Sequence, residues 1–329
     1  MSKLQEHTGA KTDAVDAFPD CAITDLSHFG LIKLSGADIR TFLQGQVTND
    51  VNAVTASQAQ VNSYCSPKGR MLGSFWLFER DGDLYMQLPL ERLEPTLKRI
   101  GMFVLRSDVT LSNESDALLR FGLSGDCSPA LLKNAPTQPW ATNTEAEITT
   151  LRLPGDRPRF EVIGPADSIT ALWNDLSGKA SSTTPAFWSL MDIRAGLPTV
   201  FDETSEAFVP QMANLQLIGG VSFKKGCYTG QEVVARMQYL GKLKRRMYRA
   251  RLAIGSAPAP GTEIFSSNSD SGQGAGRLVD SAPSPDGGFE ALVVLQISSA
   301  ESGDLHLGDA DGPLLEILPL PYAFETTEG

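Results

Sequence analysis

The chain has 329 residues, a formal net charge of −11 and a hydrophobic content of 41%. This length allows two or three domains with a sizeable core. The acidic balance argues against a dedicated nucleic-acid-binding protein, although a local basic patch could still contact phosphate.

The four cysteines, Cys21, Cys65, Cys127 and Cys227, lie far apart and form no CxxC pair. That spacing argues against a zinc ribbon or a thioredoxin-type site, and so few cysteines in so long a chain argue against a disulfide framework. The N-terminal segment lacks an apolar signal core, and no apolar run is long enough to span a membrane. We therefore expect a cytoplasmic protein with no membrane partner.

The first part of the chain predicts an α+β unit, after an N-terminal tail over residues 1–20 that we expect to be flexible. Ile39, Phe42 and Leu43 share one helical face, and the spacing of Ser35 and Asp38 predicts a capping box before them. The predicted order is strand 29–34, helix from about 37, strands 71–79 and 83–89, helix 91–105 and strand 107–112. Asp81-Gly82 between apolar runs predicts a hairpin, and the whole order resembles a ferredoxin-like unit.

A similar order returns further along, although the residues themselves do not repeat. We predict strand 117–125, helix 128–135, hairpin 147–164, helix 166–176, loop 177–185 and helix 186–196. Loop-rich sequence with short apolar runs follows, which is typical of a small β domain. We therefore predict a domain over residues 21–246, with halves at about 21–115 and 116–246, and a C-terminal β domain over 247–329.

The stretch FKKGCYTGQEVVARMQYLGKLKRR, residues 223–246, gathers positive charge around one cysteine. Thr229 and Glu232 have capping-box spacing, which predicts a helix that begins just after Cys227. The helix dipole, with Lys224, Lys225 and Arg236 nearby, would favour the thiolate. The alternative, weighted about equally on residue chemistry, is that Cys227 is a small buried apolar residue in a tight turn.

Two further clusters have both a functional and a structural interpretation. In the turn 64–70, Lys68 and Arg70 could bind a carboxylate or phosphate, or form a solvated basic turn. In the segment 43–51, polar side chains including Asp50 could bind a heterocycle, or form an Asx turn after a helix.

A basic run follows the Cys227 segment. Within the acidic chain it predicts either a solvated face or a surface for an anionic ligand tail or RNA phosphate. Its members are Lys242, Lys244, Arg245, Arg246, Arg249 and Arg251.

The motif KKGCYTGQEVVAR closely resembles the signature of the YgfZ family of folate-binding proteins, which are relatives of the glycine-cleavage T-protein, an aminomethyltransferase. The segments LSGADIRTFLQGQVTND, YCSPKGRML, IRAGLPTV, FVPQMANLQLIGGVSFKKG and LEILPLPY resemble the family in the same order. The resemblance implies two ferredoxin-like halves, a C-terminal β-barrel and a central pocket for tetrahydrofolate or a derivative. It also implies a role in making or maintaining iron–sulfur clusters, including those of enzymes that thiolate tRNA.

The resemblance also assigns roles to residues. The family's important cysteine falls on Cys227, and its aromatic folate contacts fall on Phe29 and Trp188. The T-protein and some family members carry a carboxylate at the position of Arg194; because a guanidinium cannot accept a pterin N–H, Arg194 could instead pair with the glutamate tail. Such a departure argues against simple aminomethyl transfer, and the T-protein has no clear equivalent of Cys227.

From these observations we expect a folate-binding protein that supports iron–sulfur cluster synthesis or repair. Phe29 and Trp188 would flank the pterin, and Lys68, Arg70 or Arg194 would meet anionic groups. Cys227, helped by Lys225 and Arg236, would act in redox or exchange chemistry with iron–sulfur enzymes or assembly proteins, with an indirect link to tRNA. No metal site is predicted, because a lone cysteine cannot hold a cluster in the usual Cys₄ manner.

Two alternatives stay open, and with them the question of whether the protein is an enzyme. One is a tetrahydrofolate-dependent aminomethyl or one-carbon transferase, with Asp50 as the carboxylate near folate N5. The other is a non-catalytic adaptor that binds tRNA or a tRNA-modifying enzyme through the run from Lys242 to Arg251.

Overall fold

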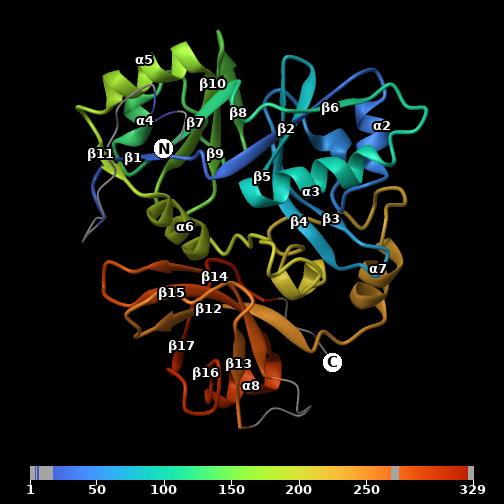
Figure 1. Ribbon diagram of the computed structural model, residues 1–329, viewed down its shortest axis with the longest axis vertical. Helices are drawn as coiled ribbons and strands as arrows, with labels where there is room; N and C mark the ends of the chain where they lie inside the picture. Colours follow the sequence, from blue (N-terminus) through green and yellow to red (C-terminus); the bar gives the residue numbers. More distant parts are fainter. Residues whose placement is uncertain (1–3, 5, 7–17, 268–273, 325–329) are drawn as a thin grey trace.

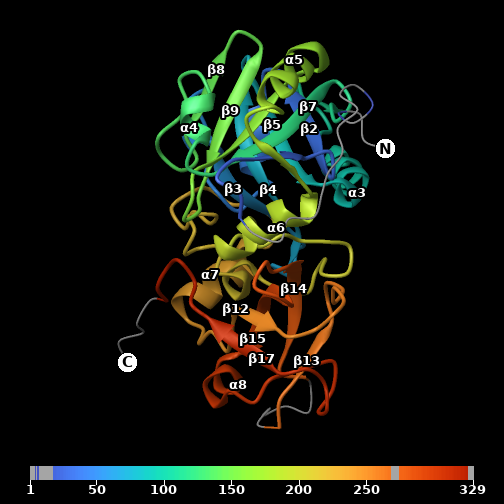
Figure 2. The same cartoon turned by 90° about the vertical axis from the view of Figure 1, so that its left-hand side faces the viewer.

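The computed structural model describes residues 4, 6, 18–267 and 274–324. Two sheets, one from each α+β half, lie side by side, and a third, C-terminal sheet lies beneath them (Figures 1 and 2). Helix α6 (Pro185–Arg194) lies between this third sheet and the other two. Most of the predicted flexible tail, residues 1–20, lies outside the described residues. Among those residues, no helix combines the length and the apolar character that a membrane span requires.

The first sheet contains five antiparallel strands in the order β3-β4-β5-β2-β6. Its strands are β2 (Phe29–Ser35), β3 (Gln60–Cys65), β4 (Met71–Arg80), β5 (Asp83–Pro89) and β6 (Thr110–Asn113), with helices α2 (Ile39–Gln44), η1 (Val51–Ala53) and α3 (Leu90–Gly101). Asp81 and Gly82 both have positive φ, 54° and 83°, which matches the twist of the predicted hairpin. With β3 set aside, the order is that of a ferredoxin-like sheet, as predicted.

The second sheet repeats this arrangement with one insertion. Its order is β11-β1-β7-β10-β9-β8. The strands are β1 (Ala22–Asp25), β7 (Leu118–Ser124), β8 (Thr142–Glu145), β9 (Ile148–Leu153), β10 (Arg159–Pro165) and β11 (Ser181–Thr183), with helices α4 (Ser128–Leu131), α5 (Ala166–Leu176) and α6 (Pro185–Arg194). The segment predicted as a loop, 177–185, contains β11, because an edge pairing with β1 orders it.

The two halves share one local device. The ferredoxin-like unit of each sheet begins with a strand, β2 or β7, that ends in Leu-Ser and is followed by glycine, and Gly36 and Gly125 have φ of 119° and 107°. A Cβ at either position would lie 2.1 or 2.0 Å from a backbone carbonyl oxygen, so only glycine fits. The predicted capping box is wrong: α2 begins at Ile39 without a side-chain cap, because the Asp38 carboxylate accepts the backbone N–H of Asp108 at 2.8 Å.

The C-terminal sheet is a curled half-barrel with the order β16-β13-β14-β15-β12-β17. Its elements are β12 (Arg245–Leu252), β13 (Glu263–Phe265), β14 (Gly276–Pro283), β15 (Phe289–Gln296), α8 (Ile297–Ser302), β16 (His306–Leu307) and β17 (Leu315–Leu318). Two backbone hydrogen bonds of 2.9 Å, from Leu307 to Pro313 and from Leu315 to Leu305, tie the two edges together. The predicted α+β fold with a C-terminal β-barrel is therefore confirmed, with the barrel incompletely closed.

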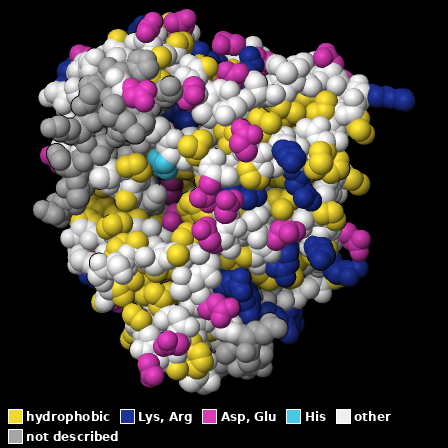
Figure 3. Space-filling view, viewed as in Figure 1, with side chains coloured by type: hydrophobic (Ala, Val, Ile, Leu, Met, Phe, Trp, Pro, Cys, Tyr) yellow, Lys and Arg dark blue, Asp and Glu magenta, His cyan; other side chains and the backbone are white. Residues whose placement is uncertain are grey.

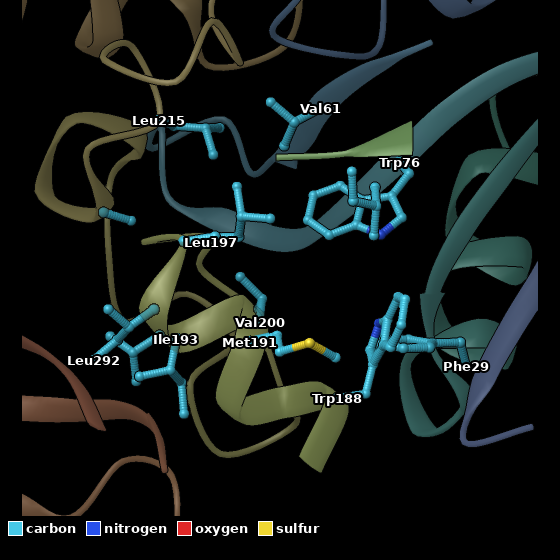
Figure 4. Close-up of a cluster of buried hydrophobic side chains, with 14 of the residues drawn as sticks. Phe29, Val61, Trp76, Trp188, Met191, Ile193, Leu197, Val200, Leu215 and Leu292 are labelled. Carbon is cyan, nitrogen blue, oxygen red and sulfur yellow. The ribbon is translucent and has the colours of Figure 1, made fainter. Parts of the chain in front are cut away.

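A shared core joins the three sheets around α6. Figure 4 shows Phe29 and Trp76 from the first sheet, Trp188 and Ile193 from α6, and Leu292 from β15 in one buried cluster. Helix α6 contributes side chains to this cluster and packs on β14 and β15. It therefore connects the C-terminal sheet to the core shared with the other two sheets.

The sequence argued against a disulfide framework, but one disulfide does form. Cys21 and Cys127 form a disulfide with Cα atoms 5.7 Å apart, although 106 positions separate them in the sequence. The pairing arises because β1 inserts beside β7, which places the start of β1 next to α4. Cys65 is a buried free thiol, and Cys227 is an exposed one.

Candidate functional site

Helix α6 presents aromatic and acidic side chains to the centre of the molecule. It begins at a Thr184 cap whose hydroxyl accepts the Phe187 N–H, and it ends before Gly196, which has φ of 67°. Trp188 is fully buried against Gly122, where an added Cβ would lie 2.2 Å from the indole. Its Nε1–H has no hydrogen-bond partner in the described structure.

A pocket of about 320 Å³ opens beside this helix, and we call it the Phe29 pocket. Its walls include Phe29 and His28, whose ring centroids lie 4.2 Å apart. Asp192 from α6 and Asp280 from β14 add two carboxylates that are only 3% and 8% exposed. The pocket therefore combines an aromatic face with buried hydrogen-bond acceptors.

Beneath the pocket lies a buried network of charges. Arg159 pairs with Asp192 at 2.7 Å, and its guanidinium carbon lies 5.4 Å from the Trp188 ring centroid. Glu161 accepts hydrogen bonds from the Gln87 amide at 2.7 and 2.8 Å. Arg120 donates to the backbone oxygen of Phe29. The network thus connects the second sheet to the residues that form the pocket.

Burial governs the protonation of these groups. It raises the pKa of Asp280 to about 7 and that of Glu161 to about 7, and in each case the charge of Asp192 adds to the effect. Burial also raises the pKa of Asp192 itself, against the opposing charge of Arg159. The pKa of His28 falls to about 4, again through burial, so its imidazole is neutral near pH 7 and offers one donor and one acceptor.

Arg194 lies at a different cavity, a cleft of about 530 Å³ that we call the Arg194 cleft. Its guanidinium bonds to Glu290 at 2.6 Å, and Arg249 bonds to the same carboxylate at 2.8 Å. Burial alone would raise the pKa of Glu290, but the two guanidinium groups outweigh it and hold the pKa below its usual value. Trp140 forms part of the cleft wall. Arg194 is therefore already paired, and it is not a wall of the Phe29 pocket.

The Cys227 segment packs against the two other polar motifs predicted from the sequence. The Lys225 ammonium donates to the backbone oxygens of Val47 and Asn49 at 2.6 and 2.8 Å. Burial lowers the pKa of Lys225 to about 8, and the charge of Asp50 opposes this shift. Lys225 therefore fixes the loop after α2 to the Cys227 segment instead of pointing freely at the thiol.

The predicted Thr229 capping box is wrong. Helix α7 (Gln231–Tyr239) begins at Gly230, which has φ of 83° and no side-chain cap. A Cβ on Gly230 would lie 2.4 Å from the Ser66 oxygen, so the turn 66–70 presses directly on the start of the helix. This contact fixes the backbone at Gly230 and removes Thr229 from the capping position.

The remaining residues predicted for the site lie in the turn 66–70, in the loop after α2 and on helix α7. Arg70 donates to the backbone oxygens of residues 206 and 207 at 3.1 and 2.8 Å. Lys68 is exposed and has no side-chain partner in the described ranges. Arg236 pairs with Glu232 at 3.0 Å on an exposed helix face, and Asp50 caps η1 and accepts from Gln44 at 2.9 Å.

The structure thus separates the predicted site residues into three places. Phe29 lines its pocket and Trp188 lies buried nearby in the shared core, whereas Arg194 lies in its own cleft. The others lie in the segment 223–239 or in the two segments that contact it, the loop after α2 and the turn 66–70. Asp192, Asp280, Glu161 and Arg159 were missed. Asp192 stands two positions before Arg194, the position at which the resemblance led us to look for a carboxylate. Nothing in the sequence indicated that Asp280 lies near Asp192. In the described part of the chain, no group of three His, Cys, Asp or Glu side chains could hold a metal ion.

The fold resembles the glycine cleavage system aminomethyltransferase T from Bartonella henselae, with a TM-score of 0.76, 15% identity and coverage of 97% of this chain and 96% of that one. At that identity, the likeness concerns the fold alone.

Two curated relatives are more similar in sequence, whereas no protein-family model matches the chain. The tRNA-modifying protein YgfZ of Colwellia psychrerythraea is 36% identical over 245 residues, which are 73% of this chain and 75% of the relative. The protein of the same name from Escherichia coli O45:K1 is 30% identical over 305 residues, or 91% of this chain and 93% of the relative. The chain therefore belongs to the YgfZ family, whose curated members carry the name tRNA-modifying protein.

Proposed function

We propose that this protein binds tetrahydrofolate or a derivative in the Phe29 pocket and supports iron–sulfur cluster synthesis or repair in the cytoplasm. Enzymes that modify tRNA would be among those whose iron–sulfur clusters it supports, which agrees with the name of its relatives. The observation that carries the folate proposal is the pair of buried carboxylates, Asp192 and Asp280, beside the aromatic face of Phe29.

A pterin matches this chemistry in shape and in hydrogen bonding. It is flat, so it can stack on Phe29, and one of its edges carries several N–H donors that carboxylates accept. His28 adds a neutral imidazole to the pocket wall, with one donor and one acceptor nitrogen. The volume of about 320 Å³ lies within the range of small-molecule sites. Asp192 and Asp280 thus take the acceptor role that Arg194 cannot fill.

Cys227 acts at a separate surface in this proposal. Its thiol is exposed and free, so it can form a mixed disulfide with a partner protein or exchange a sulfur-bound group. One cysteine cannot hold a cluster in the usual four-thiolate manner, so any cluster contact is a transfer shared with the partner's ligands. Iron–sulfur enzymes or assembly proteins are the partners that this chemistry suits.

A one-carbon transferase has less support from the geometry. Asp50, the carboxylate considered for folate N5, accepts from Gln44 and caps η1, and it is not part of the Phe29 pocket. We therefore expect Asp50→Asn to leave folate affinity unchanged.

Calorimetric titration with tetrahydrofolate tests the folate proposal. Asp280→Asn keeps the shape of the side chain but removes the charge, and we expect it to weaken binding tenfold to about a hundredfold, the value of a charge-assisted hydrogen bond. Cys227→Ala is the matched control and should bind like wild type. Absence of saturable binding to wild type, or equal affinity in Asp280→Asn, would refute the placement of folate in this pocket.

A further inference from the structure

Lysine and arginine side chains gather around the end of α7 in this acidic protein. Figure 3 shows lysine and arginine side chains gathered on the flank where α7 and the following loop lie in Figure 1. Lys224, Lys242 and Lys244 are exposed, and their ammonium groups have no partner among the residues that the structure describes. We call these lysines, together with Tyr239 and Arg245, the α7 surface.

Cations crowd one another at the base of this surface. Burial lowers the pKa of Arg245, and the charges of Arg277 and Arg70 lower it further. Arg277 has Glu263 as an ion-pair partner at 3.2 Å, but Arg70 and Arg245 donate only to backbone oxygens. Such a cluster of like charges gains from a ligand that brings several negative charges at once.

An aromatic ring stands among these cations. Tyr239 is 68% exposed and the next residue, Leu240, is 85% exposed, at the point where α7 ends. Phe223 supports the tyrosine edge-on, with ring centroids 6.0 Å apart. Lys224 follows Phe223 directly, so the start of the Cys227 segment and the end of α7 lie together. Tyr239 is therefore exposed and supported by Phe223, with Lys224 next to Phe223 and Lys242 three positions after Tyr239 in the chain.

We infer that the α7 surface binds a single-stranded segment of RNA and holds its nucleotides beside the Cys227 thiol. Unpaired lysines and crowded arginines suit a chain of phosphates, and an exposed, supported aromatic ring suits an unstacked base. An acidic protein segment would satisfy the charges but would leave the tyrosine face without a role. The inference deepens the proposed function and rests on it for the choice of RNA over DNA and for the role of the thiol.

Binding is tested with a fluorescein-labelled single-stranded RNA of about 12 nucleotides, within the usual site sizes. We expect Lys242→Gln/Lys244→Gln to reduce the slope of log affinity against log salt by about 1.4, because each phosphate contact in a single strand contributes about 0.7. The matched control is Lys98→Gln/Arg106→Gln, which removes the same charge from an exposed region of and after α3. Tyr239→Ala should weaken binding about fivefold or more, and Tyr239→Phe should not.

The position of the thiol is tested with the same RNA carrying a pyridyl disulfide. The Cys227 thiolate attacks the sulfur attached to the RNA, a protein–RNA disulfide forms, and pyridine-2-thione leaves with the electron pair. We expect this reaction to saturate with RNA concentration and to slow at least tenfold in Lys242→Gln/Lys244→Gln. A small pyridyl disulfide without RNA should react equally with both proteins.

Three results would overturn the inference. The first is no RNA binding, and the second is an equal loss of RNA affinity in the control variant Lys98→Gln/Arg106→Gln. The third is binding of a poly-glutamate peptide as tightly as RNA, with an affinity that Tyr239→Ala does not change. The last result would assign the surface to an acidic protein. Tetrahydrofolate titration of the same variants separates this inference from the folate proposal, since neither substitution touches the Phe29 pocket.

Discussion

Removal of the Arg159 guanidinium tests whether the buried charges hold the centre of the molecule together. Arg159 is 1% exposed, pairs with Asp192 at 2.7 Å and donates to the Pro154 oxygen at 2.8 Å. In Arg159→Met the side chain keeps much of its volume, but Asp192, which is 3% exposed, loses its cation in a largely buried site. Breaking a buried pair in this way costs about 3–5 kcal/mol of unfolding free energy.

The cost should depend on pH with a defined sign. Arg159 opposes the burial that raises the pKa values of Asp192 and Glu161. Without it both pKa values rise further, so the folded variant holds protons that its unfolded chain has released. The folded variant therefore loses stability as pH rises, and the difference from wild type should be larger at about pH 8 than at about pH 5.

Urea unfolding at both pH values measures this difference. Arg152→Met is the control, because Arg152 lies over the Phe160 ring at 5.3 Å without a carboxylate partner among the described residues, and its loss should cost about 1 kcal/mol or less. The double variant Arg159→Met/Asp192→Leu should recover much of the lost stability. If Arg159→Met costs no more than Arg152→Met at either pH, the charge network is not what stabilises the pocket.

Three further predictions concern the pocket, the Cys227 segment and the disulfide. Tetrahydrofolate affinity should fall as pH is lowered through about 7, because Asp280 then gains a proton and stops accepting; an unchanged profile in Asp280→Asn would contradict this. Gly230→Ala should cost at least about 1 kcal/mol in thermal unfolding, since φ is 83° and the Cβ meets Ser66, whereas Gly226→Ala, with nothing within 4 Å, should be neutral. Alkylation of the unfolded chain without reductant should label two of its four cysteines by mass spectrometry, and four labels would disprove the Cys21–Cys127 bond.

Features set by neighbouring residues were predictable from the sequence. The hairpin at Asp81-Gly82 and helix α5 (Ala166–Leu176) match their patterns, because a turn that needs positive φ and an apolar face at helical spacing are local properties. The cap of α7 was predicted wrongly for the opposite reason. A distant turn at Ser66 presses on Gly230, and sequence spacing cannot report such a contact.

The candidate site was only partly predictable for the same physical reason. Cys227 was singled out by the positive charge around it and Phe29 by family resemblance. The pocket, however, needs Asp192 from α6 and Asp280 from β14, which tertiary packing alone brings together. Likewise, the Lys225 hydrogen bonds that join the loop after α2 to the Cys227 segment have no signal in either motif. Charge and aromatic residues predicted the kinds of ligand, whereas their division among separate cavities required the structure.

Amide hydrogen exchange with and without tetrahydrofolate tests the central claim most directly, because it reports both surfaces in one experiment. We predict slower exchange in α6, around Asp280 in β14 and at the start of β2, with residues 223–241 unchanged. Protection confined to residues 223–241 would contradict the account, since it would place folate at the Cys227 surface and leave the Phe29 pocket without its proposed ligand.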